Sequence, residues 1–585
     1  MSKFNQRASV RDIRQHPQAT ENFEGGLAFN VDAKTRLYSR VVTSLFGEEK
    51  FYQSGKEHDK AILFDIEEVA TRDPEFILKL AAYARNEMYL RTVPIVLLAE
   101  AAAIPACKPF IREWTPRILR RADEPLEVLA YWMANVRQKS KIPKQLRLGI
   151  QDALNGFDEY QLEKYRNEDG QLKTSDLMRI VHPEAKDFEH DTLFHYLRRG
   201  QFKGEPTPKI AAKIKLLKTD EFNDEARSLI REGSIPWEVA IAKFGNKKEV
   251  WDALQLPFMA MLRNLRNIIQ AGADLRPAIE ALTSAQAVAR SKQFPFRFYN
   301  AYKQLLTVPG SDRLLGALSQ AISLSAGNIP KMPGKTLIAC DNSGSMDQSL
   351  SNKSSITYKE IANLFGSMAY GFCEEWTVMA FGTHYAMVVL NPGDSVFTNM
   401  QRIERADTQG YSTNGYRVIK QAREKGYHFD RMIFLSDLQC YSDRQYNDRP
   451  GAFAQELQAY RSSINPKLFV HSIDLAGYGT ALTAPDDPRS SLIAGWNEKV
   501  FQFIPLFEQE KTTAIQVIEA YRGVEDMGKS AGKKFVGIYL PEDMRKQLKI
   551  IAAMNDKSMS EIVEAAVKRY LKRNFNRLNG SKGDV

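Results

Sequence analysis

Apolar residues recur at helical spacing through residues 60–330, and proline or glycine separates the successive runs. One long example is DKAILFDIEEVATRDPEFILKLAAYARNE, in which Asp73-Pro74 marks the start of a second helix. The runs TVPIVLLAEAAAI, PKQLRLGIQDALNGF and RLLGALSQAISLSAG continue the pattern, whereas strand-like alternation is scarce. Paired helices over such a length predict an α-solenoid of HEAT-like repeats.

The pattern changes at NIPKMPGKT, residues 328–336, where proline and glycine cluster. Beyond this hinge, the short β-type runs TLIAC, WTVMAF, RMIFLS and KLFVHSID alternate with helical segments such as SITYKEIANLFGSMAYGFC and GYRVIKQAREKGY. That alternation predicts a parallel sheet with helices on both faces. We therefore predict a helical domain over residues 21–330 and an α/β domain over residues 335–523.

The C-terminal segment has a third pattern. After a linker at 524–532, residues 533–575 are predicted to form one strand and two helices and resemble a ribbon-helix-helix module, with residues 576–585 as a disordered tail. A module this small lacks a sufficient core of its own, so the resemblance implies a homodimer. The outward strand residues would be Phe535, Gly537 and Tyr539, whereas DNA readers carry polar residues there. We favour dimerisation with some nucleic-acid affinity, and RNA contact and DNA binding stay open as alternatives.

Composition refines this picture. With 585 residues the chain is too long for one core, and its 43% hydrophobic and 26% charged residues are typical of globular proteins. The net charge of +10 favours a polyanionic partner. The cysteines form neither a CxxC pair nor a zinc-ligand pattern, so we expect free thiols in a reducing, cytoplasmic compartment. Residues 1–20 carry no apolar core and are expected to form a flexible arm rather than a secretory signal.

Candidate metal chemistry lies at the ends of the predicted strands. The first strand runs into Asp341, Ser343 and Ser345, while Thr413 precedes a helix and Asp437 follows the strand IFLS. Strand ends of a parallel sheet meet at one edge, where ligands bind. A plain turn would also favour these residue types. The D-x-S-x-S run followed by Thr and Asp resembles the metal-ion-dependent adhesion site of von Willebrand factor A domains, which implies one bound Mg²⁺, held by hydroxyls and water-linked carboxylates, with a position open for an acidic group of a partner.

The helical half resembles the TROVE proteins, the Ro autoantigen family. The resemblance rests on NFEGGLAFNVDAKTRLYSRVVTSLFGEEKFY at 22–52 and on the later runs SDLMRIVHPEAKD, EVWDALQLPFMAMLRNLRN and RSKQFPFRFYNAY, in matching order over residues 20–505. It implies a ring of helical repeats closed by the A domain and no catalytic site. It further implies small noncoding Y RNA on the outer surface, single-stranded RNA ends in the central hole, and an exoribonuclease as a possible partner.

The resemblance also nominates RNA-binding residues, since Lys and Arg neutralise phosphates. The outer surface of the family corresponds to KYRNEDGQLKTSDLMRIVHP, which implies roles for Lys164, Arg166, Lys173, Arg179 and His182. Glu168 and Asp169 in the same segment are expected to repel phosphate. Further candidates are Lys144 and Arg147 outside, and on the inner surface Arg263, Arg266, Arg290, Lys292 and Arg297.

Three functions follow from these patterns. The leading hypothesis is a non-enzymatic RNA-binding scaffold in small-RNA metabolism and RNA quality control. The alternatives are a metal-dependent protein-adhesion scaffold and a DNA-binding regulator that acts through the C-terminal module.

Overall fold

The computed structural model describes residues 16–43, 50–136, 141–293, 295–350, 354–440, 452–496 and 498–523. The predicted linker at 524–532, ribbon-helix-helix module at 533–575 and tail at 576–585 lie outside the described residues. Residues 1–15 of the predicted arm do so too, and the first strand, β1, begins inside that arm at Ala19.

Residues 33–325 are helical over most of their described length. The last helix of this region, α19, is also the longest helix in the second half of the region. Local signals start many of these helices. The Ser54 side chain caps α2 in a reciprocal pair with Glu57, and Asp73 accepts a hydrogen bond from the Phe76 N–H while Pro74 occupies the first turn of α3. The helices are α1 Ala33–Val42, α2 Gly55–Ala70, α3 Pro74–Asn86, α4 Thr92–Ala103, α5 Lys108–Ile118, α6 Glu124–Tyr131, α7 Lys144–Leu154, α8 Glu159–Lys164, α9 Thr174–Val181, α10 Phe188–Arg199, α11 Pro208–Lys218, α12 Asp224–Glu232, α13 Trp237–Phe244, α14 Lys248–Ala253, α15 Phe258–Gln270, α16 Arg276–Thr283, α17 Ala285–Ser291, α18 Pro295–Leu305 and α19 Asp312–Ser325.

Close helix pairs build the core of this region. Helix α5 packs on α7 where Gly149 faces Thr115, and a Cβ at Gly149 would lie 2.6 Å from the Thr115 side chain. Trp114 and Phe76 are fully buried in the same cluster. No single helix in the described ranges has the length and hydropathy to cross a bilayer, although the bent pair Thr92–Ala103 and Pro105–Ile118 meets that test jointly.

Residues 332–519 form an α/β domain around a six-stranded sheet with the order β5-β4-β3-β6-β7-β9. All neighbours are parallel except β5, which pairs antiparallel with β4. Its elements are β3 Met332–Asp341, α20 Tyr358–Ser367, α21 Ala369–Phe372, β4 Cys373–Phe381, β5 Tyr385–Val388, α22 Val396–Glu404, α23 Tyr416–Glu424, β6 Arg431–Ser436, α24 Ala452–Ser463, β7 Phe469–Asp474, β9 Ser490–Ala494, α25 Phe503–Glu510 and α26 Ala514–Glu519.

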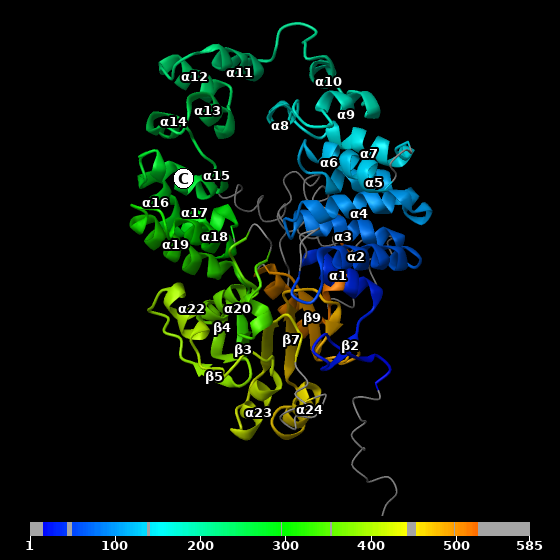
Figure 1. Ribbon diagram of the computed structural model, residues 1–585, viewed down its shortest axis with the longest axis vertical. Coiled ribbons are helices and arrows are strands. Elements are labelled where there is room, and N and C mark those ends of the chain that lie inside the picture. The colour runs from blue at the N-terminus through cyan, green and yellow to red at the C-terminus, as the bar shows by residue number, and fades with distance from the viewer. Residues whose placement is uncertain are drawn as a thin grey trace, which may run out of the picture. The chain divides into compact units, whose positions relative to one another are not determined.

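Alternation along β3 explains why both faces of the sheet are covered. Ile338 and Cys340 join the apolar cluster that includes α20 and α22, whereas Leu337 and Ala339 join the cluster built by α23 and α24. In Figure 1, α20 and α22 are labelled beside β3 and β4, and α23 and α24 are labelled below the strands. The predicted two-sided parallel sheet is therefore present. The four predicted strands all form, with β6 at the predicted limits, while β5 and β9 were not predicted because their runs are short.

Both ends of the helical region contact the α/β domain. At the first end, the Tyr38 hydroxyl donates to the Ala494 carbonyl at 3.1 Å and the Ser39 hydroxyl donates to Asp474 at 2.6 Å. A second small sheet joins β1 Ala19–Glu21, β2 Leu27–Asn30 and β8 Thr480–Ala481. At the other end, the Lys303 ammonium and the Tyr299 hydroxyl donate to Glu360 at 2.7 and 2.8 Å.

Candidate metal centre and nucleic-acid interface

The predicted metal residues lie where the chain order of the sheet reverses. Strand β3 is flanked by β4 on one side and β6 on the other, so the connections leave it in opposite directions. Such a switch point leaves a crevice at the carboxyl ends of the strands. Asp341 is the last residue of β3, and Asp437 follows directly after β6. The sheet topology therefore brings these two carboxylates to one edge.

Hydrogen bonds order the loop that follows β3. The Ser343 N–H donates to Asp341 Oδ1 at 2.9 Å, and the Ser436 hydroxyl donates to Asp341 Oδ2 at 2.5 Å. The hydroxyl oxygens of Ser343 and Ser345 are 3.4 Å apart.

A third loop carries Thr413 to the same edge. The Gly344 N–H donates to the Tyr411 carbonyl at 2.9 Å, which joins the loop after β3 to the loop that holds Thr413. All five predicted metal residues are buried.

The electrostatics of this edge fit a divalent cation. Burial raises the pKa of both Asp341 and Asp437, and the Asp341 charge raises the pKa of Asp437 further. The Asp437 Oδ2 atom is buried without a hydrogen-bond partner among the described residues. A buried, unpartnered carboxylate oxygen is costly, and a hard cation that prefers oxygen ligands would compensate it. In the described ranges no three His, Cys, Asp or Glu side chains converge on one point, so such a site depends on the Ser and Thr hydroxyls.

Neighbours of this edge were missed by the sequence reasoning. The backbone of Leu438, directly after Asp437, is left-handed with a φ of 61°, although Leu438 is buried and not a glycine. Gln439 donates its N–H to Asp437 Oδ1 at 3.1 Å. Burial, the hydrogen bond to Glu24 and the Asp437 charge raise the pKa of Tyr52, a residue nearly 400 positions away in the chain. Such distant neighbours leave no local sequence signal.

A basic cavity of about 350 Å³ forms around the N-terminus of α9 and the C-terminus of α10. It brings together three of the predicted RNA-binding residues, Arg166, Lys173 and Arg179, and adds two that the sequence reasoning missed. The additions, Arg198 and Arg199, end α10 and are exposed. We call the side chains of Arg166, Lys173, Arg179, Arg198 and Arg199 the basic cavity.

Only part of this positive charge is balanced. Arg166 pairs with Glu168 and lies over the Tyr196 ring at 4.4 Å, so the predicted repulsion by Glu168 is largely offset within the protein. Arg179 contacts Asp176 at 3.5 Å. Lys173, Arg198 and Arg199 form no ion pair with any residue that the structure describes. Three cations are thus available for phosphate oxygens.

The other outer-surface candidates lie elsewhere. Lys164 contacts Glu238 at 3.5 Å and lies over the Tyr165 ring. Arg147 donates to the Val181 carbonyl at 3.2 Å, a contact between α7 and the end of α9. His182 is exposed and ends α9 in a left-handed conformation with a φ of 50°. Lys144 is exposed at the start of α7.

The predicted inner-surface residues occupy three neighbouring helices. Arg263 and Arg266 are exposed one turn apart on α15, and Arg290 and Lys292 lie at the end of α17. Arg297 is half-buried on α18, over the Phe296 ring. These residues stay predictions, because no described cavity gathers them.

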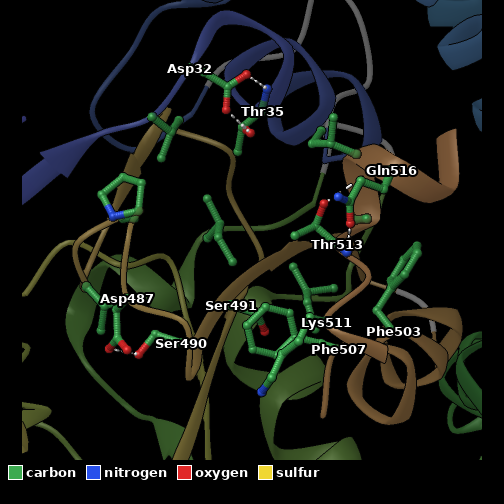
Figure 2. A pocket seen from close by; sticks show the side chains of 18 of the residues that line it. Asp32, Thr35, Asp487, Ser490, Ser491, Phe503, Phe507, Lys511, Thr513 and Gln516 are labelled. Carbon is green, nitrogen blue, oxygen red and sulfur yellow. Dashed lines mark hydrogen bonds between the residues drawn. The ribbon is translucent and has the colours of Figure 1, made fainter. Parts of the chain in front are cut away.

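A larger cavity of about 530 Å³ lies between α1, β9 and the segment from α25 to α26. Figure 2 shows Phe503 and Phe507 on one wall with Lys511, and Asp32 and Asp487 on others. Asp486 and Glu519 add further acidic side chains. This charge disfavours nucleic acid there.

Three protein-family models match parts of this chain. The TROVE domain matches residues 33–230 and 226–308, the Ro60 vWA domain matches residues 335–508, and the RH3 domain matches residues 527–581. The last match lies outside the described residues.

Curated relatives and one solved structure agree with these matches. The RNA-binding protein RO60 of Deinococcus radiodurans is 22% identical over 506 residues, covering 80% of this chain and 91% of that protein. Telomerase protein component 1 is 27% identical over 296 residues in Mus musculus and 24% over 354 residues in Rattus norvegicus, covering 40% and 50% of this chain. The chain spans only 11% and 13% of those two proteins. The crystal structure of the Deinococcus radiodurans RO (RSR) protein superposes with a TM-score of 0.60 at 18% identity, over 82% of this chain and 100% of that one.

Proposed function

The TROVE and Ro60 vWA domains support assignment of this chain to the Ro family, and from that premise we propose that it is an RNA-binding scaffold for small noncoding, Y-like RNA. The basic cavity is the observation that carries the proposal. Three cations of this cavity form no ion pair with a described residue: Lys173 stands at the N-terminal end of α9, where backbone N–H groups also favour anions, and Arg198 and Arg199 end α10. Phosphate binding follows from this charge, and RNA selectivity would come from 2′-hydroxyl and base contacts.

The wider arrangement supports a ring-shaped scaffold. Contacts of α1 with β9 and of α18 and α19 with the α20–α22 region tie both ends of the helical region to the α/β domain. A closed array of HEAT-like repeats would offer an inner surface, with Arg263, Arg266, Arg290, Lys292 and Arg297 as its cations for single-stranded RNA ends. An exoribonuclease could then be recruited through such an RNA. In this proposal the protein binds RNA and does not cleave it.

A direct binding experiment tests the proposal. Purified full-length protein is titrated into labelled RNA hairpins with a single-stranded 3′ tail, and into DNA of the same sequence, over a series of salt concentrations. We expect affinity that falls steeply with salt, a preference for RNA, and an intact RNA after prolonged incubation. Equal affinity for RNA and DNA, or none in dilute buffer, would refute it.

The sheet edge supports a second candidate function, cation-dependent adhesion. Ser343, Ser345 and Thr413 would hold Mg²⁺ through hydroxyls, with Asp341 and Asp437 in support, and the cation would offer an open position to an acidic group. The unpartnered Asp437 Oδ2 favours this proposal. Calorimetric titration of Mg²⁺ or Mn²⁺ into the wild type and Asp437→Ala tests it, because only the wild type should bind. The DNA-binding alternative rests on residues 533–575 and gains no support from the described residues.

A further inference from the structure

The segment Asn22–Gly26 lies on the loop that carries Asp437. The Asn22 side-chain amide donates to the Cys440 carbonyl at 2.7 Å, and the Phe23 N–H donates to Gln439 Oε1 at 3.0 Å. Gly26 approaches the Cys440 carbonyl so closely that a Cβ would overlap it. The start of the helical half is therefore attached to the metal-site loop at three positions.

Tyr52 makes a second attachment from the same end of the chain. Its hydroxyl donates to Glu24 Oε1 at 2.5 Å. Its ring stacks on Phe23 with centroids 5.6 Å apart and meets the edge of Tyr478 at 5.4 Å. These contacts hold Glu24 in one place, and no Lys or Arg in the described part of the chain pairs with it. We call residues 22–26 together with Tyr52 the N-terminal cap.

From this geometry we infer that the N-terminal cap completes the sheet-edge cation site from within the chain, with the Glu24 carboxylate, positioned by Tyr52, as the acidic group toward the cation. The inference rests on the proposed cation site, and it identifies the group that occupies the open coordination position of that site. A half-buried carboxylate without a cationic partner gains stabilisation from a nearby divalent ion, and hydroxyl oxygens are compatible with the same hard cation.

Two consequences follow from an internal acidic group. Cation binding should order the N-terminal cap, because the ion would be shared between the sheet edge and Glu24. By linkage, the factor by which docking of the N-terminal cap raises cation affinity equals the factor by which cation binding favours docking of the cap. An acidic partner protein would then have to displace Glu24, so the site should bind soluble acidic peptides weakly while the cap is docked.

Calorimetric titration of Mn²⁺ into full-length protein tests the inference with four variants, one of which is Asp437→Ala. Glu24→Gln and Tyr52→Phe should each weaken binding by about tenfold, the scale typical of groups that support metal ligands. Glu21→Gln, an exposed carboxylate in the neighbouring strand β1, is the matched control and should bind as the wild type does. Hydrogen exchange of residues 19–30 should slow when Mn²⁺ is added to the wild type, and should not slow in Glu24→Gln.

The outcomes separate the two proposals. If Asp437→Ala binds Mn²⁺ as tightly as the wild type, the cation site itself is refuted, and the cap inference with it. If Asp437→Ala loses binding while Glu24→Gln keeps wild-type affinity and wild-type protection of residues 19–30, the cation site stands and only the cap is refuted. Equal urea midpoints for wild type and Glu24→Gln would show that the affinity change does not come from unfolding.

Discussion

Replacing Lys173, Arg198 and Arg199 together by glutamine would remove the three cations of the basic cavity that have no ion-pair partner among the described residues. Glutamine keeps much of the side-chain length and its hydrogen-bonding capacity, so the change is chiefly electrostatic. All three side chains are exposed, and exposed substitutions of this kind alter stability by only about 0.5 kcal/mol. The variant should therefore fold normally and differ in RNA binding.

The expected size of the effect follows from counterion release. The slope of log K against log salt is negative, and each phosphate that the protein no longer neutralises makes it shallower by about 0.7 to 0.9. Three such phosphates make it shallower by about 2 to 3. Relative to a reference of about 1 M salt, a slope change of about 2 corresponds to about 100-fold weaker binding at about 0.1 M salt. Arg166 and Arg179 stay in place, so residual affinity is expected.

The assay is a salt titration of RNA affinity by fluorescence anisotropy, with the same hairpin RNA for every protein. A triple variant on the α/β domain, Lys420→Gln, Lys425→Gln and Lys467→Gln, removes the same net charge from three exposed lysines and serves as the control. An equal decrease of affinity in both triple variants would indicate general electrostatics rather than a site. An unchanged slope in the cavity variant would refute the assignment of this cavity to RNA.

Three further predictions concern stability. Glu508→Gln should lower the free energy of unfolding by about 3 kcal/mol, because it leaves the buried Arg431, whose side chain is 5% exposed, without its half-buried carboxylate partner. Urea denaturation would measure this decrease, and a decrease below about 1 kcal/mol would contradict the prediction. Although burial opposes ionisation, His471 and Arg431 lower the pKa of Glu508 to about 2. The ionised Glu508 therefore stabilises the fold fully above the pKa of about 4.3 that it has in the unfolded chain, and this contribution is lost as the pH falls toward 2. The urea midpoints of wild type and Glu508→Gln should accordingly converge as the pH falls from about 5 to about 2, and a constant difference would count against this pairing. Gly26→Ala should lower the free energy of unfolding by about 1–3 kcal/mol or detach residues 22–26 from the loop, because the new Cβ would overlap the Cys440 carbonyl. Hydrogen exchange would detect the detachment, and wild-type exchange together with wild-type stability would disprove the close approach.

Much of the candidate metal site could be predicted because each of its parts has a local pattern. A buried parallel strand is a short apolar run, and the residue after such a run lies at the sheet edge. Asp341 and Asp437 were located by this rule, and their strands end as expected. The rule says nothing about Leu438, which is buried and has a left-handed backbone although it is not a glycine.

The basic cavity was only half predictable. Lys173 and Arg179 lie on one short segment and could be nominated together, but Arg198 and Arg199 follow a whole helix later. Arg147 was nominated with them, yet its guanidinium packs against the end of α9. Exposure and direction of a side chain depend on which neighbour covers it, and that is a property of helix packing rather than of spacing along the chain.

The sequence by itself determined the helical half, the two-sided sheet and the residues at its edge, because hydrophobic periodicity and strand ends are local properties of the chain. Tertiary structure alone decided that Glu24 and Tyr52 lie beside the Asp437 loop and that Arg198 and Arg199 join Lys173. Contacts between residues hundreds of positions apart are selected by the packing free energy of the whole fold, and no local pattern encodes them.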